Sequence, residues 1–269
     1  ERRRMFIRDL SELSISDNTT DFDSVLNICL SDSDPDVKRL TISSVYESEE
    51  VTLIKPLLNV MSKESDTAIR ASAADALGQF VLRAELGEYD PQIHDMLLHG
   101  LLGIVEDDST EDLIRAKALE SVAYVDANPV RDLISSFYGN ESQILKTSAI
   151  TAMGRSGDER YSSHILSELE NEDIGMRYQA VVAAGELQLE SASNTLKRVV
   201  VEDEIELRRS AMNSLAEIGN AHTLPFLSRF IDDLLLGDDA ISAINRISLA
   251  GGSHGVMSDD EQAEEVNWW

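Results

Sequence analysis

Apolar residues recur along this chain in a pattern that predicts pairs of amphipathic helices. Six segments share one ten-residue pattern, in which an apolar residue is followed by Lys or Arg and then by small apolar residues at fixed offsets. Four of the five steps between these segments are 31 or 32 residues, and the other is 45. The segments begin at Val37, Ile69, Ile114, Leu145, Met176 and Leu207. Such a period is typical of a solenoid, in which each repeat buries its apolar face only against its neighbours.

Each segment is predicted to be the second helix of a pair. Two of the stretches before them open with a proline, at Pro91 and Pro129, and so does the stretch at Pro225 that begins a seventh, degenerate pair. The first turn of a helix tolerates a proline. Apolar residues then follow at spacings of three and four, as on one helix face. The 45-residue step holds an insertion between Gln79 and Gln92, which we expect to extend a helix or form a loop beside it. Glycines fall where second helices should end in a left-handed cap: Gly78, Gly154, Gly157, Gly185 and Gly219.

Two of the repeats resemble the HEAT repeat, especially the short HEAT-like form also found in bilin lyases. Residues 66–78 read DTAIRASAADALG and residues 173–185 read DIGMRYQAVVAAG. The resemblance covers about residues 21–250. It implies an all-α, right-handed α-solenoid of about seven antiparallel helix pairs, a HEAT-like or armadillo-type superhelix with the second helices on its concave side. It says little about function, because the family includes scaffolds, adaptors and a few enzymes.

The chain is predicted to have three parts. Residues 1–20 resemble the second helix of a truncated earlier repeat, residues 21–250 form the array, and residues 251–269 form a Gly-rich linker and an acidic tail. The first residue is Glu1 and not Met, so we expect a processed chain or a piece of a larger protein or assembly.

The tail ends in two adjacent tryptophans, Trp268 and Trp269. Each can bury about 150–250 Å² and is costly to leave in water. We therefore expect them to dock into an apolar groove. The groove could belong to a partner protein, or to the last repeats near Phe226 and Phe230, where docking would cap the array.

The charge balance argues against two classes of partner. The formal net charge is −27, from 23 Lys and Arg against 50 Asp and Glu. Such a chain repels nucleic-acid backbones and anionic membrane surfaces over most of its surface.

No apolar stretch approaches the roughly 20 residues needed to span a bilayer. Cys29 stands alone and permits no internal disulfide. We expect a cytoplasmic protein that binds other proteins.

The basic residue of each motif has two interpretations. An acid stands four residues before it in five of the six motifs, as in the pairs Asp66 with Arg70 and Asp173 with Arg177. We interpret this spacing as a repeated pair within one helix that also links adjacent repeats. The alternative is a basic row that binds a ligand.

The second helices are predicted to expose three positions of each motif, at offsets two, three and six from its first residue. Larger side chains at these positions are the hypothetical contacts with a partner segment in the concave groove, and the alternative is that they are merely solvated. These residues are Arg39, Lys117, Tyr178, Gln179, Arg209 and Asn213.

The acids gather in the turns between paired helices and are predicted to form an edge that could attract basic partners. The alternative is a solvated edge that caps helices and keeps the protein in solution. The edge residues are Asp32, Asp34, Asp36, Glu106, Asp107, Asp108, Glu172, Asp173, Glu202 and Asp203.

Motifs for chemistry are missing from the sequence. His94 and His99 are five residues apart and do not share a helix face. The run from Asp32 to Asp36 begins like a calcium loop, but Val37 stands where such a loop needs Gly. The sequence therefore predicts no metal, no cofactor and no enzyme, but a non-catalytic scaffold or adaptor. The alternative is a HEAT-like enzyme such as a bilin lyase.

Overall fold

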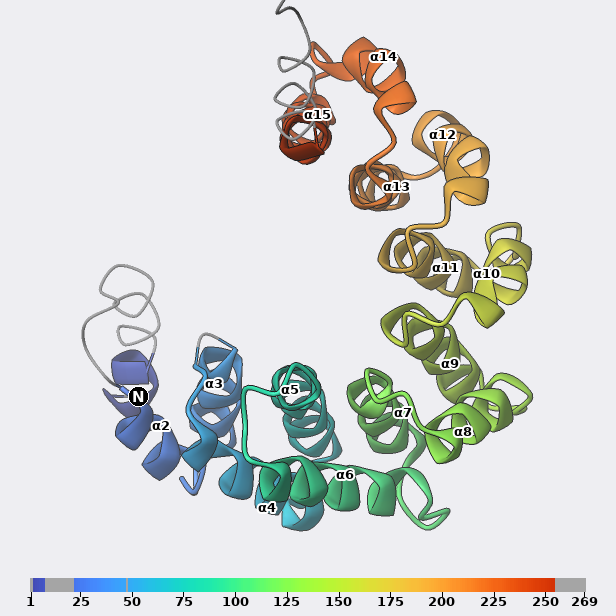
Figure 1. Cartoon of the computed structure of the whole chain (residues 1–269). Coiled ribbons are helices and arrows are strands. Elements are labelled where there is room, and N and C mark those ends of the chain that lie inside the picture. The colour runs from blue at the N-terminus through green and yellow to red at the C-terminus, as the bar shows by residue number, and fades with distance from the viewer. Residues whose placement is uncertain (1, 8–21, 47, 255–269) are drawn as a thin grey trace, which may run out of the picture. The chain divides into compact units, whose positions relative to one another are not determined.

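The described part of the chain is entirely helical. A computed structural model describes residues 2–7, 22–46 and 48–254, and no strand occurs among them. The chain divides into two compact units, residues 1–156 (unit 1) and 157–269 (unit 2). Both units are built from the same helix pair (Figure 1).

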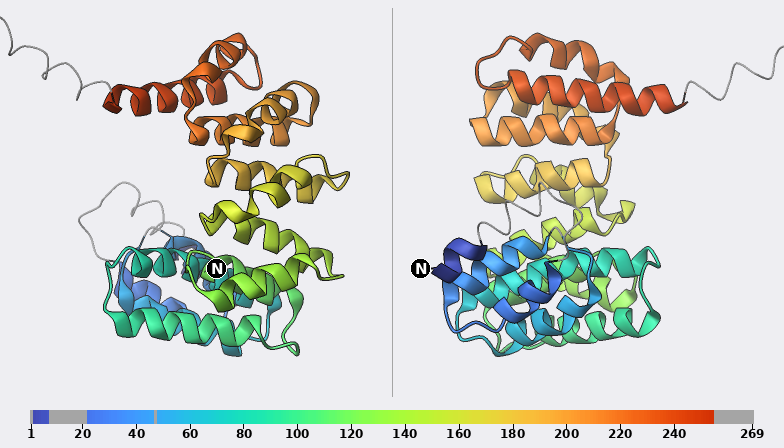
Figure 2. Two further views of the ribbon diagram at one scale, coloured as in Figure 1. Left: turned by 45° about the vertical axis from the view of Figure 1, so that its right-hand side comes forward. Right: turned by 90° about the vertical axis from the view of Figure 1, so that its left-hand side faces the viewer.

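Unit 1 contains four helix pairs, preceded by helical residues 2–7. Its first helices, one 3-10 turn included, are α2 (Asp23–Cys29), η1 (Val51–Leu53) with α4 (Ile54–Lys63), α6 (Pro91–Val105) and α8 (Asn128–Tyr138). Its second helices are α3 (Pro35–Val45), α5 (Thr67–Glu85), α7 (Asp112–Val122) and α9 (Gln143–Arg155). Each second helix packs on its own first helix and on the neighbouring second helix of the unit, so the unit has two layers (Figure 2).

Unit 2 contains three more pairs. Its first helices are η2 (Glu159–Tyr161) with α10 (Ser162–Glu168), η3 (Glu190–Ala192) with α12 (Ser193–Glu202), and η4 (Ala221–Thr223) with α14 (Leu224–Leu227) and η5 (Ser228–Phe230). Its second helices are α11 (Ile174–Glu186), α13 (Ile205–Ile218) and α15 (Gly237–His254). The described residues thus hold seven pairs, and the prediction of an all-α solenoid of about seven pairs is confirmed.

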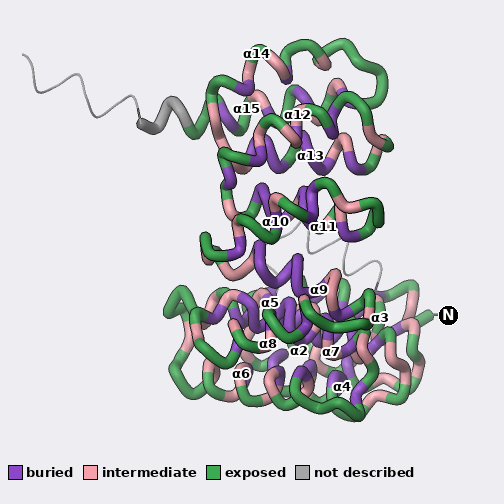
Figure 3. The backbone as a smooth tube through the Cα atoms, turned by 90° about the vertical axis from the view of Figure 1, so that its right-hand side faces the viewer, coloured by how far each residue is buried: buried purple, intermediate pink, exposed green. Residues whose placement is uncertain are grey.

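Small residues bring the second helices close together. Serine hydroxyls on one second helix donate to backbone carbonyls of the one before: Ser121 to Ala74 at 2.7 Å, Ser148 to Ala116 at 2.8 Å and Ser214 to Val181 at 2.8 Å. Figure 3 shows how buried residues gather along these helices. The repeated Ala, Ser and Gly of the motif are therefore explained by packing between second helices.

The glycine prediction is correct at two positions and wrong at three. Gly157 and Gly219 have φ of 63° and 70°, and Gly219 ends α13 as a left-handed cap. Gly78, Gly154 and Gly185 lie inside helices α5, α9 and α11. A Cβ on Gly185 would stand 2.8 Å from the Cα of Ser214, so this glycine serves close helix contact and ends no helix.

The insertion lengthens a helix, as one of the two expectations held. Helix α5 runs 19 residues, from Thr67 to Glu85, before the loop that leads to α6.

At the other end of unit 1, Ile7 is fully buried against Val37 and Phe22. The helical residues 2–7 thus pack on the first pair. The division into residues 1–20, 21–250 and 251–269 stays a prediction.

Candidate binding surfaces

In three of the six motifs, the basic residue connects one repeat to the next. Arg70 donates to Glu111, at 3.1 Å between Nη1 and Oε2, and Arg177 donates to Asp203 at 2.9 Å. Lys38 pairs in the same way with Glu64. Each acid belongs to the turn of the following repeat. The linking part of our interpretation therefore agrees with the structure, but the pair within one helix is wrong, because the acid four residues earlier is engaged elsewhere.

The same arginines also bind the ends of the first helices. The Nε of Arg70 donates to the Met61 carbonyl at 2.8 Å, that of Arg115 to Val105 at 3.0 Å and that of Arg208 to Val200 at 2.7 Å. Carbonyls in the last turn of a helix have no partner within the helix and carry its negative dipole end, so a guanidinium satisfies them well. This basic row is used internally, which argues against the alternative of a ligand-binding row.

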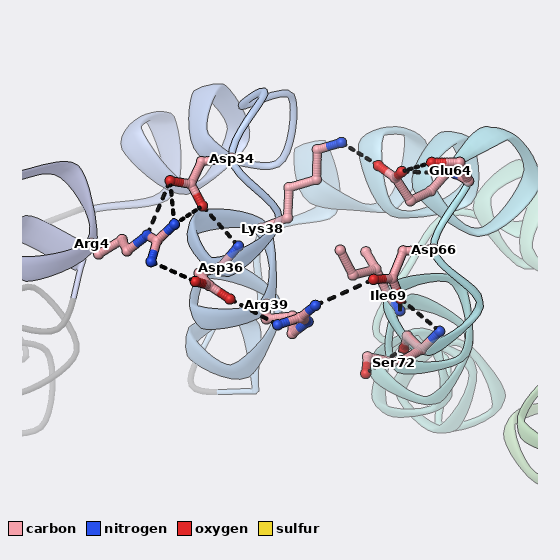
Figure 4. A network of polar contacts seen from close by, with 11 residues as sticks. Arg4, Asp34, Asp36, Lys38, Arg39, Glu64, Asp66, Ile69 and Ser72 are labelled. Carbon is pink, nitrogen blue, oxygen red and sulfur yellow. Dashed lines mark hydrogen bonds and ion pairs between the residues drawn. The ribbon is translucent and has the colours of Figure 1, made fainter. Parts of the chain in front are cut away.

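The acids that cap α3 and α5 accept hydrogen bonds from arginines on helical residues 2–7 and on α3, respectively (Figure 4). Asp34 caps α3 and accepts three hydrogen bonds from Arg4, at 2.9–3.0 Å. Asp66 caps α5 and accepts one from Arg39 at 3.2 Å. Asp36 connects the two arginines, at 2.6 Å from Arg4 and 2.8 Å from Arg39. Arg4 thus takes the place that Arg39 has one repeat later.

These contacts change the acidity of the carboxylates. The hydrogen bonds from Arg4 are the main cause that lowers the pKa of Asp34. The pKa of Asp66 is lowered mainly by the backbone N–H of Ile69, which it accepts as the helix cap. The hydrogen bond from Lys38 is the main cause that lowers the pKa of Glu64 to about 2. The three groups are therefore ionised well below neutral pH.

The predicted acidic edge is thus partly neutralised from within. Five of its ten residues pair with bases: Asp32 with Arg3, Asp34 and Asp36 with Arg4, Asp108 with Arg115, and Asp203 with Arg177. Asp107 and Asp173 accept hydrogen bonds at turns and helix starts. In the described part of the chain, no ion pair involves Glu106, Glu172 or Glu202, which are exposed. That the edge binds basic partners stays a prediction.

A chain of polar contacts crosses the second helices of unit 1. The Tyr46 hydroxyl at the end of α3 donates to Asp75 of α5 at 2.5 Å, and Asp75 lies 3.8 Å from the Lys117 ammonium of α7. Lys117 also donates to Glu120 at 2.7 Å, and Arg155 of α9 donates to the Glu120 carbonyl at 3.2 Å. Burial, followed by the Asp75 carboxylate, raises the pKa of Tyr46. Four helices therefore contribute to one continuous polar face.

Sequence reasoning found only part of this face. It selected Lys117, which is half-buried; Arg39, which it also selected, is exposed and pairs with Asp36 and Asp66 outside this face. It missed Tyr46 and Arg155, because both lie beyond the motif positions that we compared. A signal existed in the helical spacing, since Tyr46 stands three residues after Ser43 and Arg155 four residues after Thr151, and Ser43 and Thr151 hold the compared offset of six.

Apolar residues border the polar face at the start of three second helices. We call Ala68 of α5, Leu113 of α7 and Ile144 of α9 the apolar row. All three are exposed, Leu113 at 38% and Ile144 at 48%. Each stands one residue before the buried residue that opens its motif, so the three hold equivalent positions on neighbouring helices.

In unit 2 the structure brings the other predicted groove residues onto α11 and α13. Tyr178 and Asn213 are exposed, and Gln179 is half-buried. Arg209 is largely engaged within the unit, since its Nε lies 3.3 Å from Asp239 and its Nη2 donates to the Leu235 carbonyl at 3.2 Å. Tyr178 and Asn213 are therefore the exposed residues of this patch that a partner could contact without breaking the contacts of Arg209.

Two small hollows occupy equivalent places in the repeats. One of about 240 Å³ in unit 1 is lined by Lys38 and Glu64, and one of about 200 Å³ in unit 2 by Arg177 and Asp203. Both lie over the pair that links adjacent repeats, where the ends of two successive first helices approach each other. The hollows follow from the geometry of the repeat.

Three further expectations concern the two tail tryptophans, metal binding and membrane-spanning helices. Trp268 and Trp269 lie outside the described residues. Among the residues that are described, no cluster of His, Cys, Asp and Glu could hold a metal ion. None of the helices in that part of the chain is both long and apolar enough to cross a membrane.

Comparison with known proteins shows the fold. No protein-family model matches the chain, and no curated protein matches it in sequence. The complex of CpcE and CpcF of phycocyanin lyase from Nostoc sp. matches in structure with a TM-score of 0.54 and 17% identity, over 84% of this chain and 93% of that chain. Human deoxyhypusine hydroxylase matches with a TM-score of 0.38 and 12% identity, over 84% of this chain and 96% of that one. The chain therefore has a HEAT-like helical-repeat fold.

The prediction that the chain is not an enzyme is contradicted by the match to phycocyanin lyase. Phycocyanin lyase, which matches with a TM-score above 0.5, is an enzyme by name. The prediction used the lack of catalytic motifs to choose a binding role for this fold. Because the fold also occurs in enzymes, that step was wrong.

Proposed function

We propose that this chain binds an extended segment of a partner protein across the second helices of unit 1. The observation that carries the proposal is the apolar row of Ala68, Leu113 and Ile144. Equivalent positions on stacked repeats give a regular series of contacts, which suits a partner segment lying across the helices. Exposed apolar residues at one position of three successive helices mark an interaction surface more strongly than single exposed residues do.

The polar face beside the apolar row can fix the direction in which a partner segment lies. Asp75 and Lys117 are both partly exposed, at 30% and 35% of their side chains, and can exchange their mutual contact for hydrogen bonds to a peptide backbone. Acids and bases balance on this face, since Asp75 and Glu120 stand against Lys117 and Arg155. A face without net positive charge favours a protein segment over a nucleic acid.

The test is a pull-down from the native source with the apolar row changed. Leu113→Asp with Ile144→Asp should lose the partners that the wild type recovers, because two carboxylates would replace the apolar contacts. The control is Ile28→Asp on α2, an isoleucine that is 75% exposed on a first helix of the same unit. Equal recovery by the wild type and the double variant, with unchanged thermal unfolding, would refute the proposal.

A second contact is proposed on unit 2, at Tyr178 and Asn213. Their side chains are exposed on neighbouring helices, and tyrosine is a frequent anchor in protein interfaces. Tyr178→Ala with Asn213→Ala should weaken recovery of the same partners. Arg209 is left unchanged in this test, because its loss would also break the contacts between α13 and α15.

An enzymatic role of the phycocyanin-lyase kind is the second candidate. The match in fold over 84% of this chain is the observation that raises it. Neither of the two hollows, of about 200 and 240 Å³, is large enough to enclose a bilin. Mixing the purified protein with a free bilin and recording absorbance tests this candidate: a shift that Leu113→Asp with Ile144→Asp abolishes would favour it over the scaffold.

A further inference from the structure

The turn before the last helix of unit 2 presents leucines to solvent. Residues 231–236, which we call the leucine turn, connect η5 to α15 and read IDDLLL. The side chain of Leu234 is fully exposed, at 101%, and those of Leu235 and Ile231 are 58% and 42% exposed. No other large apolar residue in the described part of the chain is as exposed as Leu234.

The leucine turn is held in one conformation. The Asp233 carboxylate accepts hydrogen bonds from the N–H groups of Leu235 at 2.9 Å and Leu236 at 3.1 Å. The Asp233 N–H donates to the Phe230 carbonyl at 3.0 Å, and the Asp233 carbonyl accepts from Gly237 at 2.9 Å. Both the backbone and the side chain of Asp233 therefore fix the turn.

The turn is also anchored to its surroundings. Leu236 is fully buried, and the Leu235 carbonyl accepts a hydrogen bond from Arg209 of α13 at 3.2 Å. A Cβ on Gly237 would stand 2.7 Å from the Ile231 carbonyl oxygen, so the two ends of the turn are in close contact. Leu234 and Leu235 are exposed because the fold holds them outward, which lowers the entropy lost when they enter a binding pocket.

Acidic residues near the exposed leucines limit which partners can bind the leucine turn. Asp232 and Asp238 are exposed on either side of the two leucines along the chain. A second copy of this chain would bring a net charge of −27 to the same place, and the tail of residues 255–269 carries five acids and no base. Both would be repelled. A pocket that is apolar inside and bordered by Lys or Arg satisfies the leucines and the acids together.

We propose that the leucine turn is a docking element for a partner protein with an apolar pocket bordered by basic residues. Leu234 and Leu235 enter the pocket, and Asp232 and Asp238 face its basic border. This surface is separate from the apolar row on unit 1 and does not depend on the function proposed for that row.

Site-directed photo-crosslinking in extract of the native source tests the proposal. The probe is a benzoylphenylalanine introduced at position 234 of the full chain, and the matched control carries it at exposed position 248 on α15. We expect an adduct from position 234 whose cross-linked residues line an apolar pocket flanked by Lys or Arg. The yield should fall at least threefold in 0.5 M NaCl, and likewise when Asp232→Asn and Asp238→Asn are combined.

The other outcomes overturn the proposal. They are an adduct with a second copy of the chain, an adduct within residues 255–269, equal adducts from positions 234 and 248, a yield that salt leaves unchanged, and no adduct at all. Thermal unfolding of each variant shows that it is folded. Because Leu234 is fully exposed and its neighbours keep their hydrogen bonds, we expect the unfolding midpoint to stay within about 2 °C of the wild type.

Discussion

Arg70 on α5 donates to Glu111, which stands 41 residues later at the start of α7, at 3.1 Å. Its Nε also donates to the Met61 carbonyl at the end of α4. One side chain thus joins a first helix, its own second helix and the following repeat. In a solenoid, where a repeat contacts only its neighbours, such a link transmits geometry from one repeat to the next.

Arg70→Lys should destabilise the protein although the charge is kept. A lysine has one ammonium and cannot donate to Met61 and Glu111 with the fixed fork of a guanidinium. We expect a loss of about 1 kcal/mol in the free energy of unfolding, measured by urea denaturation. The control is Arg160→Lys, since Arg160 is 55% exposed and pairs with Asp158, two residues away. Equal effects of the two changes would contradict the linking role.

Glu64 should make stability depend on pH in the acid range. Its pKa falls from 4.5 to about 2 because Lys38 donates to its carboxylate. A carboxyl with a lowered folded pKa stabilises the protein above its unfolded pKa, and this contribution disappears as pH falls through the folded value. In Glu64→Gln the decline in unfolding temperature between pH 5 and pH 2 should be shallower than in the wild type. Glu172→Gln, at an exposed glutamate, should keep the wild-type slope.

The fold could be predicted from the sequence because the repeat pattern encodes it directly. The motifs that begin at Ile69 and Leu207 lie on second helices, and those helices stack as the spacing requires. The surfaces could be predicted less well. The spacing of Asp66 and Arg70 fits a pair within one helix, but Asp66 caps that helix instead, and Arg70 reaches the next repeat. The partner that each of these side chains takes depends on distances between repeats, and a single sequence does not contain those distances.

The glycines carried a signal that our prediction did not use. Gly78 is the tenth residue of its motif and continues a helix, whereas Gly219 lies three residues beyond the tenth position of its motif and ends one. The tenth position faces the neighbouring second helix, because a Cβ on Gly78 would stand 3.0 Å from the Ser121 hydroxyl there. Register within the motif therefore separates a glycine that serves packing from one that serves a cap, but which position faces the neighbour is known only once the partner helix is in place.

Ser121→Ala should measure the hydrogen bonds between second helices. The Ser121 hydroxyl is buried and donates to the Ala74 carbonyl at 2.7 Å. We expect a loss of about 1 kcal/mol in the free energy of unfolding, the usual net value of one such bond. Ser136→Ala, at an exposed position on α8, should cost nothing, since alanine is the better helix former. Equal urea midpoints for the two variants would show that these hydroxyls do not hold the helices together.

Adding one methyl group should have opposite effects at two helical glycines. A Cβ on Gly185 would meet the Cα of Ser214 at 2.8 Å and its Cβ at 2.9 Å, and backbone cannot yield as a flexible side chain does. Gly185→Ala should therefore force α11 and α13 apart and lower the free energy of unfolding by about 1–3 kcal/mol. On exposed Gly103 of α6, a Cβ would meet no atom within 4 Å. Gly103→Ala should raise stability by about 0.5–1 kcal/mol, because alanine is the better helix former. Calorimetric unfolding of both variants measures whether the two changes in the free energy of unfolding have opposite signs. A stabilising Gly185→Ala would mean that α11 and α13 are not in the close contact described above.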